Sequence, residues 1–127
     1  MIEKNIVNTT RDGGSLGDKI QVADTFLTRL IGLMGRKSLD PGAGLLLRHC
    51  SSIHTFWMRI PIDAVYLDRT LCVKAIDVAL KPWRAGTIRR HVRHVLELPA
   101  GTAVRLGLRV GDILAIKDTN VPGTPAA

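Results

Sequence analysis

Residues 53–68, IHTFWMRIPIDAVYLD, decide the fold of this chain. They hold one of its two Phe residues, one of its two Trp residues and its only Tyr, although only 4% of the chain is aromatic. Large rings stabilise a fold mainly by burial, so this concentration predicts that the hydrophobic core is built here. The stretch also contains His54, Arg59 and Asp63, and buried ionisable groups are costly unless they are paired or hydrogen-bonded. These polar residues therefore mark either structural anchors or a functional site.

The length and composition are those of one folded, soluble domain. The 127 residues can bury a sizeable core, and 46% of them are hydrophobic and 23% charged. No apolar run approaches the roughly 18 residues of a membrane span, and the N-terminal residues lack the apolar segment of a secretion signal. Cys50 and Cys72 have no spacing typical of a disulfide framework, which favours reduced thiols. We therefore expect a cytoplasmic protein without a membrane span.

Hydrophobic periodicity and turn residues predict mostly short strands. An amphipathic helix is expected at about 25–35, capped by Asp24 or Thr25, because apolar residues recur there at three- and four-residue spacing. A short helix is expected at about 102–106, and the glycine-rich segment 12–18 is predicted to be a loop. The strands are expected at 6–7, 19–23, 45–49, 62–67, 71–78, 92–98 and 113–117.

The predicted fold class is α+β, with a compact, mostly antiparallel and barrel-like β-sheet and these two helices. We divide the chain into an N-terminal strand and loop (1–19), a single globular domain (20–117) and a flexible tail (118–127). The apolar faces of separate elements should bury one another in a common core. Its predicted members are Leu33, Phe56, Ile62, Val65, Leu67, Leu96 and Ile113.

Positive charge is concentrated between Lys81 and His94. The chain carries a net charge of +7, and this segment has five Lys and Arg side chains and no acid. Pro82 and Gly86 interrupt any periodicity, so we predict an exposed, irregular loop at 81–91 that helps to keep the protein soluble. Such a segment could attract nucleic acid, an anionic ligand or an acidic partner. No stacking-aromatic motif or recognition helix accompanies it, which disfavours nucleic acid.

Five ordered motifs give the chain a family resemblance. Residues 20–117 contain RLIGLM (29–34), GLLL (44–47), IHTFWMR (53–59) followed by PID (61–63) and LD (67–68), VLELPAG (95–101) and GD (111–112). In these motifs the chain resembles the bacterial and archaeal family named domain of unknown function 192. The resemblance implies a small, β-rich fold, and it implies no established activity.

Asp63 is the most informative candidate residue. It lies between Ile62 and Ala64 in a nearly continuous apolar strand, so it should be buried. A buried carboxylate needs a cation or several hydrogen bonds, which Arg29, Arg59 or backbone amides could supply. We predict this structural role, with the carboxylate ionised. A functional interpretation, as a general base or a ligand-binding acid in a cleft, stays open.

His54, Trp57 and Glu97 are the other candidates. His54 can donate and accept a proton near neutral pH, and Trp57 could line an apolar ligand pocket. Glu97 alternates with Leu96 and Leu98, which predicts a half-buried strand with the carboxylate on its polar face. Each residue also has an ordinary structural interpretation, in the core or at the edge of a strand.

We expect no metal and no cofactor. His49, Cys50 and His54 are metal-ligand types, with His91 and His94 further along, but their spacing matches no structural zinc pattern. The chain also lacks a phosphate-binding glycine loop, a nucleophile elbow and a metalloprotease helix. The sequence therefore leaves open whether the protein is an enzyme.

The leading hypothesis is a non-catalytic accessory module that binds an unidentified small molecule or protein partner. Its ligand-binding cleft is predicted to be lined by Arg29, His54, Trp57, Asp63 and Glu97. The alternative is a small hydrolase or isomerase that uses Asp63 or Glu97 with His54 as acid–base groups. A third hypothesis is weak association with nucleic acid through residues 81–93.

Overall fold

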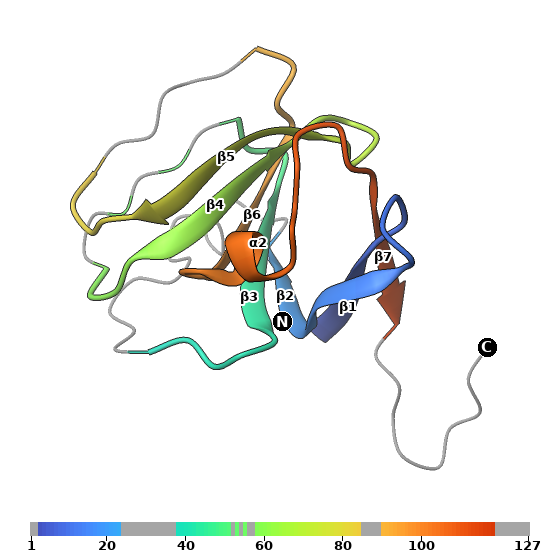
Figure 1. The fold of residues 1–127 in the computed structure, drawn as a ribbon. Coiled ribbons are helices and arrows are strands. Elements are labelled where there is room, and N and C mark those ends of the chain that lie inside the picture. Colours follow the sequence, from blue (N-terminus) through green and yellow to red (C-terminus); the bar gives the residue numbers. More distant parts are fainter. Residues whose placement is uncertain are drawn as a thin grey trace.

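The computed structural model describes residues 3–23, 38–51, 53, 55, 58–84 and 90–118. These residues form one seven-stranded sheet, with the strand order β5-β4-β6-β3-β2-β1-β7, and one short helix, α2 (Figure 1). Strands β2 and β3 run parallel, and the other neighbours run antiparallel. The elements are β1 Glu3–Asn8, β2 Gly14–Ala23, β3 Ala43–Arg48, β4 Ile62–Leu67, β5 Val73–Leu80, β6 His94–Pro99, α2 Thr102–Arg105 and β7 Leu114–Asp118.

The described part of the chain is mostly β, so the predicted α+β class is confirmed only in its sheet and in the short helix α2. The helix predicted at about 25–35 lies outside the described residues. Among the residues that the structure covers, no helix is both long and apolar enough to cross a membrane.

Strand β4 matches the predicted strand 62–67 from end to end, whereas β2 begins at Gly14 and not at residue 19. Most of the segment predicted as a loop is therefore strand. The reason lies at Gly17, where an added Cβ would come within 2.6 Å of the carbonyl oxygen of Gly42. Glycine here permits close packing of two backbones and does not signal a turn.

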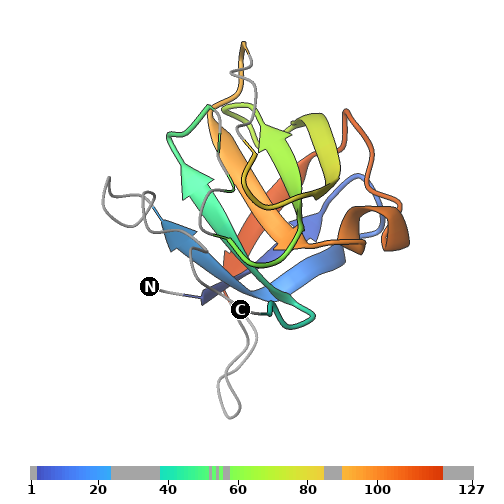
Figure 2. The same cartoon turned by 90° about the vertical axis from the view of Figure 1, so that its left-hand side faces the viewer.

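The sheet curls until its two outer strands almost meet, but it does not close into a barrel. An isolated antiparallel bridge joins Cys72, just before β5, to Ile113, just before β7. The amide of Leu114 also donates to the carbonyl of Leu71 at 3.0 Å. Figure 2 shows the strands of the two chain ends, in blue and red, on the same side of the molecule. The barrel-like prediction is thus confirmed for curvature and not for closure.

Hydrophobic clusters cover both faces of the central strands. Along β4, Val65 and Leu67 belong to a larger cluster, whereas Ala64 and Tyr66 belong to a second cluster. The larger cluster draws on every described element and so fills the inside of the curl. Its buried members are Ile6, Leu16, Ile20, Leu46, Val65, Leu67, Val73, Leu96, Leu98, Ala103, Leu108 and Leu114. Those of the second cluster are Ala23, Leu45, Leu47, Ile53, Met58, Ile62, Ala64, Tyr66, Val92 and Val95.

The predicted core is confirmed at four positions and wrong at one. Ile62, Val65, Leu67 and Leu96 are at most 1% exposed, although Ile62 belongs to the second cluster and the others to the larger one. Ile113 is 47% exposed, because the buried phase of β7 starts one residue later, at Leu114. A one-residue shift moves every side chain of a strand to the other face. Leu33 and Phe56 lie outside the described residues.

Strand β6 lies between β3 and β4, and its residues His94 to Leu98 are all buried. The prediction of a half-buried strand is wrong here. Alternating polar and apolar residues indicate a solvent-exposed face only in a sheet that has one face in water, and the sheet is covered on both faces at β6. Glu97 therefore lies in the interior and not at a strand edge.

The described part of the predicted basic loop is irregular, as expected. Its exposed residues are Lys81, Trp83, Arg84, Arg90 and His91. The prediction is confirmed for these positions, and residues 85–89 lie outside the description.

Candidate functional site

Asp63 is fully buried, and each oxygen of its carboxylate accepts a backbone hydrogen bond. The amide of Ala79 donates to Oδ1 and the amide of Ala103 donates to Oδ2, both at 2.9 Å. Of the predicted partners, the backbone amides are confirmed. Arg59 is exposed, and Arg29 lies outside the described residues.

The local fold explains why these two amides are available. Ile62 pairs with Leu80 and Ala64 with Asp77, so two residues of β5 oppose Asp63 in a β-bulge. Ala79 in the bulge has a left-handed φ of 51°. Its amide has lost its place in the ladder, and the amide of Ala103, in the first turn of α2, has no partner within the helix. Asp63 satisfies both groups and thereby ties β5 to α2.

Glu97 is also buried, but one oxygen of its carboxyl group lacks such a partner among the described residues. It is 3% exposed, and no described residue hydrogen-bonds to Oε2. Its neighbours across the sheet are Leu45 on β3 and Ala64 on β4, both apolar. Burial raises the pKa of Glu97 to about 8. At neutral pH this side chain is therefore mostly a neutral acid, which can donate a hydrogen bond.

Asp63 and Glu97 point to opposite faces of the sheet. Asp63 is paired with Leu98 of the larger cluster, and Glu97 is paired with Ala64 of the second cluster. Directly paired residues of antiparallel strands share a face, so one cleft on one face cannot hold both carboxyl groups. A cleft on one face can therefore include Asp63 or Glu97, but not both. The other predicted cleft residues, Arg29, His54 and Trp57, lie outside the described residues.

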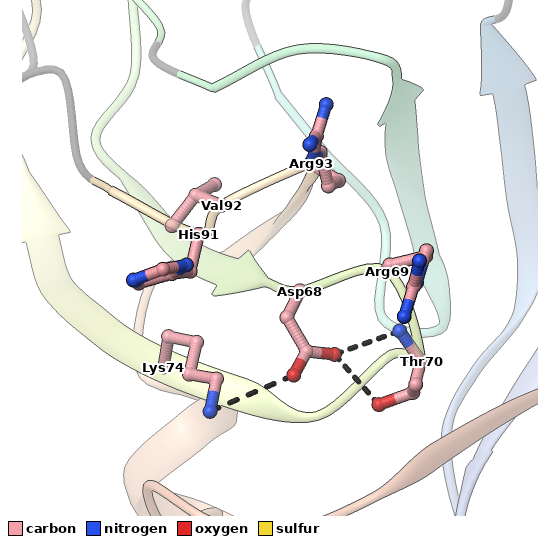
Figure 3. Close-up of a pocket in the computed structure, with 7 residues that line it drawn as sticks. All are labelled: Asp68, Arg69, Thr70, Lys74, His91, Val92 and Arg93. Carbon is pink, nitrogen blue, oxygen red and sulfur yellow. Dashed lines mark hydrogen bonds and ion pairs between the residues drawn. The ribbon is translucent and has the colours of Figure 1, made fainter.

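A different group of side chains surrounds a pocket on the surface. This pocket of about 480 Å³ lies between the β4–β5 turn and the segment before β6 (Figure 3). We call it the basic pocket. Its lining residues are Asp68, Arg69, Thr70, Lys74, His91, Val92 and Arg93.

Asp68 holds the turn that forms the floor of the basic pocket. Its Oδ1 accepts hydrogen bonds from the amide and hydroxyl of Thr70, both at 2.8 Å, and from the amide of Cys72 at 3.0 Å. Its Oδ2 faces Lys74 at 3.5 Å. Burial alone would raise the pKa of Asp68, but these hydrogen bonds and the Lys74 charge outweigh burial and hold the pKa below its usual value. Asp68 is therefore ionised at neutral pH.

Backbone hydrogen bonds fix the opposite wall of the basic pocket. The amide of Arg93 donates to the carbonyl of Leu67, and the amide of Cys50 donates to the carbonyl of Arg93, both at 2.8 Å. His91 has a left-handed φ of 65°. The side chains of His91 and Arg93 are thus exposed on a wall whose backbone is anchored to the end of β4.

Sequence reasoning found half of the basic pocket. It singled out the positive segment that contains His91 and Arg93, and it missed Arg69 and Lys74. The link between the two halves is the antiparallel pairing of β4 with β6, which places Leu67 opposite His94. The turn that follows β4 then lies beside the residues that precede β6. The available signal was the tight turn at Asp68–Arg69–Thr70 combined with that pairing.

The histidines near the basic pocket pack against each other. The rings of His49 and His94 lie 5.6 Å apart, and the amide of His49 donates to Nδ1 of His94 at 3.2 Å. Burial, followed by the charges of Arg48 and His49, lowers the pKa of His94. Within the described residues no group of three or more His, Cys, Asp or Glu side chains could hold a metal ion.

Comparison with known proteins gives consistent matches along most of the chain. The family model DUF192, described as "Uncharacterized ACR", matches residues 7–116. A UPF0127 protein of Thermococcus kodakarensis is 33% identical over 87% of this chain and 71% of its own length. A UPF0127 protein of Pyrococcus furiosus is 34% identical over 86% of this chain and 95% of its own length.

Two solved structures have a similar fold. A Sinorhizobium meliloti protein described as a candidate transcription regulator has a TM-score of 0.78 and 25% identity, over 91% of this chain and 96% of its own. A Novosphingobium aromaticivorans protein of unknown function has a TM-score of 0.73 and 22% identity, over 89% of this chain and 83% of its own.

Proposed function

Since the chain belongs to DUF192, a family described only as uncharacterized, we propose a function from its own geometry: a non-catalytic module that binds an anionic ligand in the basic pocket. The observation that carries the proposal is the convergence of Arg69, Lys74 and Arg93 on one pocket of about 480 Å³. Pockets for small ligands commonly measure about 300–1,000 Å³. A concave surface lined mainly by one sign of charge concentrates ions of the opposite sign.

Among the described lining residues, the basic side chains outnumber the one acid. Arg69, Lys74 and Arg93 have basic side chains, and Asp68 is the one carboxylate among the described lining residues. Oδ1 of this carboxylate is already engaged by three donors of its own turn. The hydroxyl of Thr70 also points at Asp68, so it is used to build the turn. This use of the polar groups supports a binding role over a catalytic one.

The cleft predicted from sequence stays a second proposal, now divided between two faces. Glu97 favours it most, because a buried acid without a described partner has a hydrogen bond to offer. The hydrolase or isomerase alternative would combine His54 with Glu97 or with Asp63, and not with both. The cleft that the sequence predicts for a binding module is lined by Arg29, His54, Trp57, Asp63 and Glu97, and of these Asp63 and Glu97 lie on opposite faces of the sheet.

Weak nucleic-acid association through residues 81–93 stays the third hypothesis. The description of the Sinorhizobium meliloti neighbour as a candidate transcription regulator supports it. Binding of this kind should fall steeply with added salt, because it depends on the release of counterions from phosphates. A small anion in the basic pocket should depend on salt much less.

A titration with inorganic phosphate, followed by the chemical shifts of backbone amides, tests the leading proposal. We expect shifts at residues 68–74 and 91–93. Arg93→Gln should weaken binding about threefold to tenfold, because a charge-assisted contact is lost. The matched control is Arg105→Gln, because Arg105 follows the Pro99 end of β6 whereas the pocket lies at the His94 end. Equal affinities of both variants, or shifts confined to other residues, would overturn the proposal.

A further inference from the structure

We infer that the ligand of the basic pocket is zwitterionic, with an anionic group for the arginines and an ammonium group for Asp68. This inference rests on the proposed anion-binding function and names the class of its ligand. The observation behind it is the unequal use of the two oxygens of Asp68. Three hydrogen bonds from the turn reach Oδ1, whereas Oδ2 contacts Lys74 alone among the described residues.

The contact between Oδ2 and Lys74 is loose. Its length is 3.5 Å, whereas a charge-assisted N–H···O hydrogen bond usually measures about 2.7–2.9 Å. The side chain of Lys74 is 45% exposed and that of Asp68 is 20% exposed, so solvent reaches both. An ionised carboxylate oxygen can accept about two hydrogen bonds. Oδ2 therefore has room for a cationic donor from a ligand.

The arrangement of charges suits a ligand with two ends. In Figure 3, Lys74 and His91 lie on one side of Asp68, Arg69 lies on the other side, and Arg93 lies above it. A simple anion would be repelled by the Asp68 charge, since like charges oppose each other. A ligand that carries an ammonium group beside its phosphate or carboxylate turns this repulsion into attraction. Asp68 then discriminates between ligands as well as holding its turn.

Two probes that differ by one ammonium group test the inference. Phosphoethanolamine carries the group, and ethyl phosphate does not. Both are titrated calorimetrically against the full chain and its Asp68→Asn variant at one pH and ionic strength. Asparagine keeps the acceptor at Oδ1 for the turn and removes the charge. We expect Asp68→Asn to weaken phosphoethanolamine about threefold to tenfold and to leave ethyl phosphate unchanged or bound more tightly.

This crossover separates the inference from a simple effect of net charge. Removal of a negative charge alone would tighten the binding of both probes, because both carry a phosphate. Asp40→Asn is the matched control, because Asp40 is exposed and lies far from the pocket. It precedes β3, whereas the pocket lies near the other end of that strand, where Arg48 pairs with His94. It should change neither affinity. If Asp68→Asn tightens both probes or weakens both equally, the inference fails and the anion site stands. If neither probe binds the unaltered chain, the proposed function fails first.

Lys74→Gln is a second test of the inference, and it leaves the hydrogen bonds of the Asp68 turn in place. The variant frees Oδ2 of its protein partner and removes one positive charge from the pocket. Ethyl phosphate should bind more weakly, whereas phosphoethanolamine should bind as well as before or up to about threefold more tightly. Equal weakening of both probes would overturn the inference even if Asp68→Asn failed to fold.

Discussion

Two buried carboxyl groups lie on neighbouring strands of this sheet, and they differ in their hydrogen-bond partners. Asp63 accepts one backbone amide on each oxygen, whereas Oε2 of Glu97 meets no hydrogen-bond partner among the described residues. Both are almost completely removed from water. Burial therefore does not decide what an acid does in a protein; its partners do. Asp63 is built into the fold, and Glu97 retains hydrogen-bonding capacity.

The largest expected effect of a single substitution is the loss of the Asp63 carboxylate. Asp63→Asn replaces one acceptor with an NH₂ group that faces a backbone N–H, so one buried amide loses its bond. We expect the free energy of unfolding to fall by about 3 kcal/mol, the upper end of the cost of leaving a buried polar group unsatisfied. Urea denaturation measures it, with the exposed Asp40→Asn as control. An unchanged midpoint would show that Asp63 is not a structural anchor and would revive the enzyme hypothesis.

The next effect is a pH dependence that originates in Glu97. Its pKa in the folded protein is about 8, above the ordinary value of 4.5, so the folded state keeps a proton that the unfolded state releases. The contribution of Glu97 to the free energy of unfolding is fully present below pH 4.5 and is lost as the pH rises through 8. The slope should be on the order of 1 kcal/mol per pH unit.

Glu97→Gln tests this dependence, because glutamine is neutral throughout. Denaturation curves between pH 5 and pH 9 should show the loss in the unaltered chain and a flatter profile in the variant. Parallel profiles would mean that Glu97 is paired after all, and the contrast with Asp63 would disappear.

The smallest effect concerns the bulge that Asp63 supports. Ala79 has a left-handed φ, which glycine adopts at less cost. Ala79→Gly keeps the amide that Asp63 binds, so we expect stability to rise by at most about 1 kcal/mol. Ala100→Gly, at an exposed position without a left-handed φ, should instead lower stability slightly. Thermal melting compares them, and a clear loss in Ala79→Gly would show that the bulge is not strained.

The sequence predicted the first carboxyl group better than the second. An Asp inside the nearly continuous apolar run of β4 had to be buried, and its need for backbone amides followed from the cost of burying a charge. Glu97 alternates with leucines, which is the pattern of a strand with a wet face. Only the strand order shows that β6 is enclosed by β3 and β4. The sequence indicated only half of the basic pocket for the same reason, because its two walls are brought together by long-range strand pairing.

The pairing of β1 with β7 has a consequence for how the chain folds during its synthesis. Lys4 and Asp118 are 114 positions apart, yet they form an ion pair at one end of this ladder. Contacts that close such long loops form slowly, because the entropy of closure must be lost before the contact is gained. During synthesis from the N-terminus, β1 can pair with β2 early but waits for β7 to emerge. Until then its outer edge can pair with other chains, and chaperones should matter most during this interval.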